Sequence, residues 1–110
     1  MSFEVILSEI FKKEIKILSK KYFSIKSDYE KLIDLLEVNP TFGTPLGKNC
    51  YKIRLAIKSK KKGKSGGSRV ITYVVTEKKE VVLLTIYDKN NKSDLEPKEL
   101  DFLLKSFDSE

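Results

Sequence analysis

The segment that decides the fold runs from residue 50 to residue 87 and reads CYKIRLAIKSKKKGKSGGSRVITYVVTEKKEVVLLTIY. Apolar and basic residues alternate at its start, which is typical of a strand with one buried face. One face would carry Tyr51, Ile53, Leu55 and Ile57, and the other would carry Lys52, Arg54 and Lys58. Two more strands are predicted over residues 69–76, rich in β-branched side chains, and residues 80–87, apolar enough to be buried on both faces. The short polar segments at 59–67 and 76–79 join the three strands as antiparallel hairpins.

Two helices are predicted upstream of this sheet. Residues 3–7 form a short apolar run, which indicates a first strand, and Ser8 is placed to cap the helix that follows it. Residues 27–30, Ser-Asp-Tyr-Glu, read as a capping box that starts a second helix, and Asn39-Pro40 ends it. Apolar residues recur at helical spacing at Phe11, Ile15, Leu18 and Tyr22 and again at Tyr29, Leu32 and Leu36. Residues 41–49 contain two glycines and a proline and are expected to form a loop.

Downstream of the sheet, residues 88–94 are polar and predict a loop. A last helix is expected to begin near Pro97 and to carry Leu100, Leu103, Leu104 and Phe107. The chain therefore predicts a single α+β domain over residues 1–110, in which a helical hairpin packs on one face of a twisted antiparallel sheet. The opposite face is expected to stay partly open, with Lys52 and Arg54 on it.

The composition excludes several kinds of chemistry. The chain has no histidine and one cysteine, so the usual zinc sites and histidine-based acid–base catalysis are not available. We expect neither a metal nor another cofactor. Cys50 is interpreted as a small buried hydrophobic residue rather than a reactive thiol, since no histidine is present to activate it. The N-terminus lacks the pattern of a signal peptide and no apolar run is long enough to span a membrane, so a cytoplasmic protein without membrane contact is expected.

The positive charge is concentrated in one part of the sequence. The chain has 22 basic and 16 acidic residues, a net charge of +6. No acidic residue occurs between Glu37 and Glu77, and nine basic residues do. Outside this span the chain has 13 basic and all 16 acidic residues, so the rest of the chain has a net charge of −3. Segregation of this kind is typical of a surface that binds a polyanion such as RNA.

Two groups of basic residues differ in what they predict. The lysine-rich turn, Lys58 to Lys64, is compatible with phosphate contact without sequence preference, and equally with a solvated loop. Lys52 and Arg54 lie within a strand, with side chains roughly 6–7 Å apart on one face. Arg69 begins the neighbouring strand and could join them. Cations this close repel each other unless they share an anion, so we favour function over a solvated face for these three residues.

Three motifs in the right order give the sequence a recognisable resemblance. They are CYKIRL at residues 50–55, GKSGGSRVITY at residues 63–73 and LLTIYDK at residues 83–89. Together they resemble the RelE/ParE superfamily of toxins from bacterial type II toxin–antitoxin systems, nearest its HigB-like branch. The resemblance covers nearly the whole chain and implies a RelE-like fold, an N-terminal strand and two-helix hairpin packed on a twisted antiparallel sheet, with a C-terminal helix.

The resemblance also implies an activity, the ribosome-dependent, metal-independent cleavage of messenger RNA. The ribose 2′-hydroxyl would attack the adjacent phosphate and give a cyclic phosphate and a 5′-hydroxyl end. By motif, Lys52 matches a family lysine that assists proton removal and Arg54 matches a neighbouring basic residue. Arg69 matches the arginine that stabilises charge on the phosphorane, and Lys89 falls where RelE itself has another arginine.

Further RNA contacts are expected from the remaining basic residues. The candidates are Lys48, Lys58, Lys60, Lys61, Lys62 and Lys64. RelE has a tyrosine near its C-terminus that stacks on a base, whereas this chain has Leu95 at the aligned position. Tyr73 or Tyr87 would have to take that role, and the alternative interpretation of both is a core aromatic residue.

The resemblance leaves more than one function open. The leading hypothesis is an mRNA-cleaving toxin that binds the ribosome and is restrained by a cognate antitoxin, either an acidic or a helix-turn-helix protein. One alternative is a ParE-like inhibitor of DNA gyrase, which shares the fold and cleaves no nucleic acid. A second alternative is a non-catalytic RNA- or ribosome-binding domain.

Overall fold

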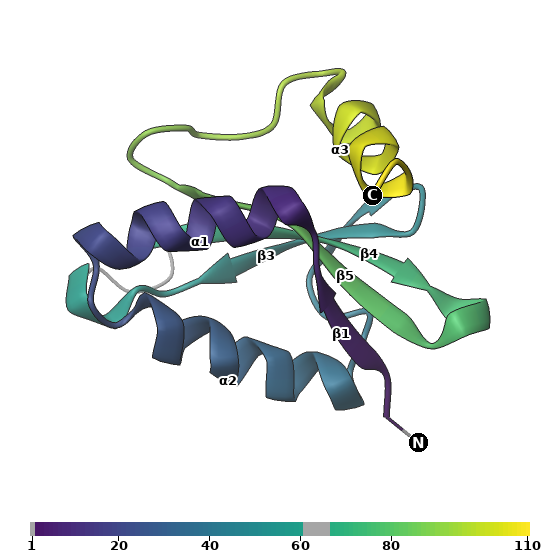
Figure 1. Cartoon of the computed structure of the whole chain (residues 1–110), viewed down its shortest axis with the longest axis horizontal. Helices are drawn as coiled ribbons and strands as arrows, with labels where there is room; N and C mark the ends of the chain where they lie inside the picture. Colours follow the sequence, from purple (N-terminus) through teal and green to yellow (C-terminus); the bar gives the residue numbers. More distant parts are fainter. Residues whose placement is uncertain (1, 61–66) are drawn as a thin grey trace.

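The computed structural model describes residues 2–60 and 67–110 and contains one five-stranded sheet with three α-helices (Figure 1). The strands are β1 (Glu4–Leu7), β2 (Thr44–Gly47), β3 (Cys50–Leu55), β4 (Ser68–Val75) and β5 (Glu80–Asp88). The helices are α1 (Glu9–Lys21), α2 (Ile25–Val38) and α3 (Glu99–Asp108), with 3-10 turns at Lys58–Lys60 and Thr76–Lys78. The strands lie in the order β1-β5-β4-β3-β2, so β4 is the central strand.

The two faces of the sheet are covered by different helices. On one face α1 and α2 pack against Ile53, Val70, Leu83 and other apolar side chains of the sheet. On the other face Leu103 of α3 belongs to a second apolar cluster with Cys50, Ile71, Val82, Leu84 and Tyr87. Figure 1 shows α3 lying apart from the α1–α2 pair. The predicted α+β class and C-terminal helix are therefore confirmed, and α3 covers part of the face that the sequence left open.

The start of α2 differs from the prediction. The expected capping box at Ser27 is wrong, because the helix already begins at Ile25 and Ser24 is its N-terminal cap residue. The Asp28 backbone N–H donates to the Ser24 carbonyl at 2.9 Å, which places Ser27 inside the first turn. The Asp28 side chain is buried and accepts from the Ser24 hydroxyl and the Lys58 backbone N–H. The Ser-Asp-Tyr-Glu pattern at residues 27–30 therefore does not cap the helix. Its Asp28 side chain makes a tertiary contact with the segment after β3. The cap of α1 is confirmed, since the Phe11 N–H donates to Ser8 Oγ at 3.1 Å.

Two features of the sheet also differ from the prediction. The segment 41–49 is not wholly a loop, because residues 44–47 form the edge strand β2, which pairs with the start of β3. The sheet is not wholly antiparallel, because β1 pairs with β5 in parallel. The connection from β1 passes through both helices before the chain enters the sheet again, and such a crossover permits parallel pairing.

Gly43 explains how the chain enters β2. Its φ of +115° belongs to the region that favours glycine, and a Cβ there would lie 2.7 Å from the Lys52 carbonyl oxygen. Only glycine therefore lets this loop lie against β3. The close approach matters for the site, because Lys52 is one of its candidate residues.

Candidate nucleic-acid interface

A row of three side chains crosses strands β3, β4 and β5. Arg54 pairs with Arg69, and Arg69 pairs on its other side with Tyr87. Residues that pair directly across strands have Cα atoms roughly 5 Å apart and side chains on the same face. Tyr87 packs in the cluster beneath α3, so the row lies on the α3 face of the sheet. The structure thus brings the two arginines together. Arg69 is 3% exposed, and its guanidinium donates to the Ser68 carbonyl at 3.1 Å.

Lys52 joins this face two residues before Arg54. Its ammonium lies 3.5 Å from an Asp94 carboxylate oxygen. The pKa of Asp94 lies below its usual value, because the Leu95 N–H donates to the carboxylate and because Lys52 and Lys89 place positive charge near it. The Lys52 ammonium therefore already has an anionic partner, the Asp94 carboxylate.

An open hollow of about 240 Å³ lies beside these basic residues. Lys52, Arg54 and Ile53 line it from β3, and Phe42, Gly43 and Thr44 line it from the entry to β2. The hollow therefore depends on the tight glycine turn described above. A phosphate that entered it would meet two cations carried by one rigid strand.

The Tyr87 side chain is held among charged groups. Burial raises the pKa of its phenol to about 12, and the nearby Asp94 carboxylate acts in the same direction, so the phenol is neutral at pH 7. Lys92 lies over the ring, 5.5 Å from its centre, and pairs with Glu99. Within the described residues the buried Tyr87 hydroxyl has no hydrogen-bond partner.

Asp88 anchors the 3-10 turn Lys58–Lys60 to the end of β5. It is 2% exposed, and its two oxygens accept from the Lys60 ammonium at 2.7 Å and the Tyr22 hydroxyl at 2.6 Å. Burial raises its pKa, but these hydrogen bonds and one from the Asn90 N–H outweigh burial and bring the pKa to about 2. The Lys60 side chain is itself 5% exposed. Its charge is therefore paired within the protein, which argues against the predicted RNA contact for Lys60.

The other predicted contact residues lie apart from this row. Lys48 is exposed and forms an ion pair with Asp101 of α3. Lys58 is exposed on the side of β3 that faces α2. Tyr73 lies four residues from Arg69 along β4 and packs against the cluster that contains Cys50. Lys61, Lys62 and Lys64 lie outside the described residues.

Sequence reasoning missed the acidic members of this region. Asp88 and Asp94 looked like parts of a polar loop, although each organises a basic residue through its side chain. The only local signal was an acidic residue directly after a fully buried strand. Cys50 behaves as predicted, since it is 1% exposed and burial raises its pKa to about 11. Among the described residues, no three Cys, Asp or Glu side chains gather as metal ligands would, and no helix is long and apolar enough to cross a membrane.

Comparison with known proteins places the chain in a family. Residues 15–108 match the family described as the RelE toxin of the RelE/RelB toxin–antitoxin system. The chain is similar in fold to a mutant of the E. coli toxin RelE in the free state, with a TM-score of 0.63 and 18% identity over 99% of this chain and 97% of the other.

Two further solved structures are also similar in fold to this chain. One is the intact E. coli RelBE toxin–antitoxin complex, with a TM-score of 0.58 and 25% identity over 78% of this chain and 95% of the other. The second is the isolated E. coli RelE toxin, with a TM-score of 0.58 and 19% identity over 94% of this chain and 97% of the other. Because the family match spans most of the sequence and the fold agrees, the chain belongs to the RelE toxin family.

Proposed function

We propose that this chain is the toxin of a toxin–antitoxin pair, that it acts as a single domain in the cytoplasm, and that it cleaves messenger RNA on the ribosome. The observation that carries the proposal is a group of three basic side chains on the α3 face. Lys52 and Arg54 lie on β3, and Arg69 lies beside Arg54 on β4. The Asp94 carboxylate beside Lys52 supports an anionic ligand there. The relationship of this chain to the HigB-like branch stays a prediction.

The residues suggest how cleavage would proceed without a histidine. Lys52, in its neutral form, would take the proton of a ribose 2′-hydroxyl, whose oxygen then bonds to the adjacent phosphorus. Arg69 and Arg54 would stabilise the negative charge that builds up on the phosphorane. The bond from phosphorus to the 5′ oxygen then breaks, that oxygen takes a proton from water, and Lys52 returns the proton it took to the solvent. The products are a cyclic phosphate and a 5′-hydroxyl end. Lys89 would add positive charge beside Lys52.

The two arginines differ in how far they are buried. Arg69 is buried in the central strand, whereas Arg54 is exposed. Arg69 therefore has a fixed direction, as a group that stabilises a transition state should have. Tyr87 is its direct neighbour, but its ring is 8% exposed and its hydroxyl is buried, so Tyr87 fits the interpretation as a core aromatic residue.

The test is induced expression followed by mapping of mRNA 5′ ends. We expect growth arrest and new 5′-hydroxyl ends within translated codons. Lys52→Ala and Arg69→Ala are each expected to lower single-turnover cleavage on programmed ribosomes by about 10²-fold or more, the effect typical of a removed acid–base or charge-stabilising group. Binding to ribosomes should persist in the Lys52→Ala variant. Unchanged cleavage in both variants would refute the site.

Two alternatives are separated by adding a DNA supercoiling assay with purified gyrase to this experiment. A gyrase inhibitor would block DNA supercoiling by purified gyrase and leave mRNA intact. A non-catalytic ribosome-binding domain would arrest growth without new RNA ends. The strand-borne cationic row argues against the first alternative, since inhibition of gyrase needs no such cluster.

We also propose that an antitoxin restrains the chain. The similar RelBE structure is described as a toxin–antitoxin complex. The net charge of +6 suits an acidic partner. Purification of this chain with the protein encoded in the adjacent reading frame would test this, and the toxicity of the chain should disappear when that frame is co-expressed.

A further inference from the structure

Helix α1 and its turn into α2 carry a second concentration of positive charge. Between residues 13 and 26 the exposed lysines are Lys13, Lys16, Lys20, Lys21 and Lys26. The one acidic residue in this range, Glu14, is turned toward β5, where its carboxylate accepts from the Ile86 N–H at 3.0 Å. The next acidic residue, Asp28, is 4% exposed. The exposed side of α1 after residue 12 is therefore basic, with no exposed carboxylate among these lysines.

Phe23 stands at the turn between the two helices and is 90% exposed. Three of the lysines, Lys20, Lys21 and Lys26, lie within three residues of it along the chain. We call these four side chains the tip surface. A single exposed apolar residue is common on protein surfaces, so the flanking charge is what distinguishes Phe23. An exposed aromatic ring among cations is typical of sites where an unpaired RNA base stacks and its phosphates are neutralised.

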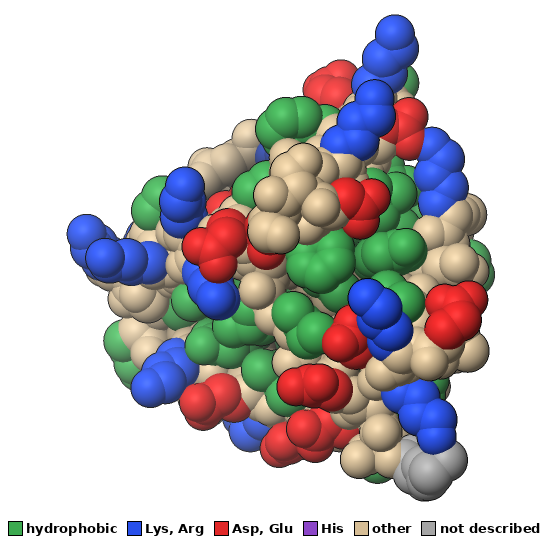
Figure 2. All heavy atoms as spheres, turned by 45° about the vertical axis from the view of Figure 1, so that its right-hand side comes forward, with side chains coloured by type: hydrophobic (Ala, Val, Ile, Leu, Met, Phe, Trp, Pro, Cys, Tyr) green, Lys and Arg blue, Asp and Glu red, His purple; other side chains and the backbone are tan. Residues whose placement is uncertain are grey.

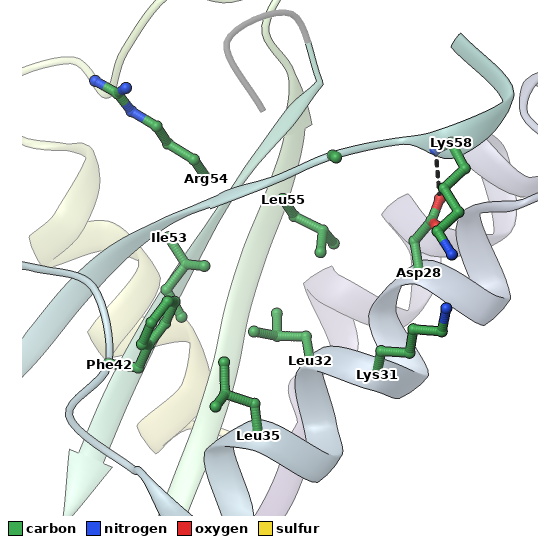
Figure 3. A pocket seen from close by; sticks show the side chains of 10 residues that line it. Asp28, Lys31, Leu32, Leu35, Phe42, Ile53, Arg54, Leu55 and Lys58 are labelled. Carbon is green, nitrogen blue, oxygen red and sulfur yellow. Dashed lines mark hydrogen bonds between the residues drawn. The ribbon is translucent and has the colours of Figure 1, made fainter. Parts of the chain in front are cut away.

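Hydrogen bonds fix the start of α2 against the turn that follows β3. The Ser59 N–H donates to the Ser24 hydroxyl oxygen at 2.9 Å. The Lys58 N–H donates to the Asp28 carboxylate at 3.2 Å (Figure 3). Figure 1 shows the connection between α1 and α2 beside the segment that follows β3. The start of the lysine-rich turn, with the exposed Lys58, is therefore held against the tip of the helical hairpin.

The backbone on the other side of Phe23 is also fixed. The hydroxyl of Tyr22 donates to the buried Asp88 carboxylate at 2.6 Å. Lys21 lies 4.0 Å from the same carboxylate, yet its side chain stays 59% exposed. Since both flanks of Phe23 are held, the ring is presented to solvent from a rigid turn. A ligand that stacks on it would spend little free energy on ordering the backbone.

The tip surface is separate from the proposed site of cleavage. Helices α1 and α2 pack on one face of the sheet, whereas Arg54 and Arg69 lie on the α3 face. The outward side of α2 carries the exposed carboxylates of Glu30 and Asp34, so the basic surface ends at the start of this helix. Nucleotides held by the two arginines therefore lie across the sheet from Phe23. A second stretch of RNA is needed to cover the tip surface.

We propose that the tip surface binds ribosomal RNA, with an unpaired base stacked on the Phe23 ring and the adjacent phosphates on its lysines. The proposal rests on the proposed function, since it assumes that the chain binds the ribosome. The ribosome supplies RNA other than the strand that is cleaved. This contact would hold the toxin in place while β3 and β4 act on the messenger RNA.

The first test measures the affinity of the chain for ribosomes that carry no mRNA, by co-sedimentation. Phe23→Ala should lower this affinity by about tenfold, the effect typical of a lost base–aromatic stack. Phe102→Ala removes a phenylalanine of α3 that is 60% exposed and should change the affinity less than about twofold. Because both side chains are exposed, both variants should fold. Equal affinities of the two variants would overturn the proposal.

Phe23→Leu separates stacking from simple apolar contact. Leucine keeps an apolar side chain and lacks the flat ring, so Phe23→Leu should bind ribosomes as weakly as Phe23→Ala. Phe23→Tyr keeps the ring and should bind like the parent chain. Parent-like binding by Phe23→Leu would contradict a stacked base.

A pair of charge reversals tests the lysines. Lys20→Glu should weaken ribosome binding by about tenfold or more, because it places a carboxylate among the proposed phosphate contacts. Lys78→Glu changes the net charge equally, at an exposed position in the β4–β5 turn, and should weaken binding less than about threefold. Equal effects of both reversals would mean that only net charge matters, which contradicts a defined site.

The source of the ligand is tested with other binding partners. Phe23→Ala should leave the affinity for a single-stranded RNA oligonucleotide unchanged, because that RNA is expected at β3 and β4. An equal loss of oligonucleotide and ribosome binding would assign the tip surface to the cleaved strand and overturn the proposal. Weaker binding of the antitoxin, with ribosome binding unchanged, would overturn it in favour of a protein partner.

The results also separate this proposal from the proposed function. Ribosome binding that depends on Phe23, in a chain that cleaves no mRNA, would support the tip surface and refute the nuclease. If the chain cleaves mRNA, Phe23→Ala should raise KM and leave kcat unchanged. Cleavage with neither KM nor ribosome affinity altered by Phe23→Ala would support the nuclease and refute the tip surface.

Discussion

Asp94 is the residue that most directly connects the described structure with the proposed chemistry. Its carboxylate is 63% exposed yet lies beside Lys52, with Lys89 nearby. It therefore competes with any phosphate that enters the site. We predict that Asp94→Asn binds a single-stranded RNA oligonucleotide more tightly, by about two- to fivefold, consistent with a partly screened charge pair.

A matched variant controls for net charge in this experiment. Asp108→Asn removes an exposed carboxylate at the end of α3 and should leave the affinity unchanged. Fluorescence anisotropy with a labelled oligonucleotide measures both variants. Equal affinity of Asp94→Asn and the parent chain would show that Asp94 does not occupy the phosphate position.

Asp88 makes a prediction about stability and pH. A carboxyl whose pKa is depressed from 3.8 to about 2 stabilises the fold above pH 4, and this contribution is lost as the pH falls through 2. Asp88→Asn should therefore lower the free energy of unfolding by about 2 kcal/mol at pH 7, or more because Lys60 is left buried without its partner. Urea unfolding at pH 7, 4 and 2.5 measures the difference.

The difference between the parent chain and Asp88→Asn should shrink toward low pH. Asp34→Asn, at an exposed position on α2, serves as the control and should be nearly neutral throughout. A constant difference between pH 7 and pH 2.5 would mean that the Asp88 charge is not the source of the stability.

At the scale of elements, helix α3 decides how much of the second sheet face is covered. Leu103 is its one buried side chain among the described residues and packs in the cluster that contains Cys50. Leu103→Ala should cost about 2–4 kcal/mol and loosen α3 from the sheet. Cys50 then acts as a reporter, because its thiol reacts with a disulfide reagent only when the helix opens.

We expect the thiol of Cys50 to react at least tenfold faster in Leu103→Ala than in the parent chain. Phe102→Ala is the control, since Phe102 lies on the same helix with its side chain 60% exposed. Equal rates in all three proteins would show that α3 does not protect the sheet face.

Another element-scale feature is the edge of β5 beyond β1, which is closed by a side chain. Strand β1 pairs with β5 only as far as Leu83. Farther along, the Glu14 carboxylate of α1 accepts from the Ile86 N–H at 3.0 Å and from the Thr85 hydroxyl at 2.7 Å. Burial raises the pKa of Glu14, and these hydrogen bonds partly offset that effect. A side chain of α1 therefore satisfies the edge of β5 where β1 no longer pairs with it.

At the scale of the whole molecule, charge should govern how the chain meets RNA. The face in Figure 2 shows acidic side chains between the projecting lysine and arginine side chains, around a hydrophobic centre. Uniform positive charge does not cover this face, although the chain carries +6. We expect the affinity for RNA to come from a limited number of phosphate contacts at Lys52, Arg54 and Arg69 of β3 and β4.

The salt dependence of binding counts those contacts. We predict a linear fall of log affinity with log salt, and a slope that decreases by about 0.7–1 in Lys52→Ala and in Arg54→Ala. Lys79→Ala, in the β4–β5 turn away from the row, should leave the slope unchanged. An equal change in all three variants would indicate a diffuse charge effect without a defined site.

The sequence predicted those parts of the fold that local patterns control. Alternation with a period of two placed Ile53 and Leu55 on one face of β3 and Lys52 and Arg54 on the other, as the structure has them. Ser8 was correctly placed between β1 and α1, because its hydroxyl caps the helix by accepting from the N–H of Phe11, three residues later. The same patterns could not find β2, a short edge strand with a proline and a glycine and only four residues.

By itself, then, the sequence determined the order and type of most elements, the basic segment and the face that carries the candidate residues, because each follows from contacts within a few residues. Only the tertiary structure decided the parallel pairing of β1 with β5, the place of α3, the burial of Lys60 against Asp88 and the approach of Asp94 to Lys52. The last two join residues 28 and 42 positions apart. No periodicity encodes such pairs, because they form only once the core has packed and brought distant segments together.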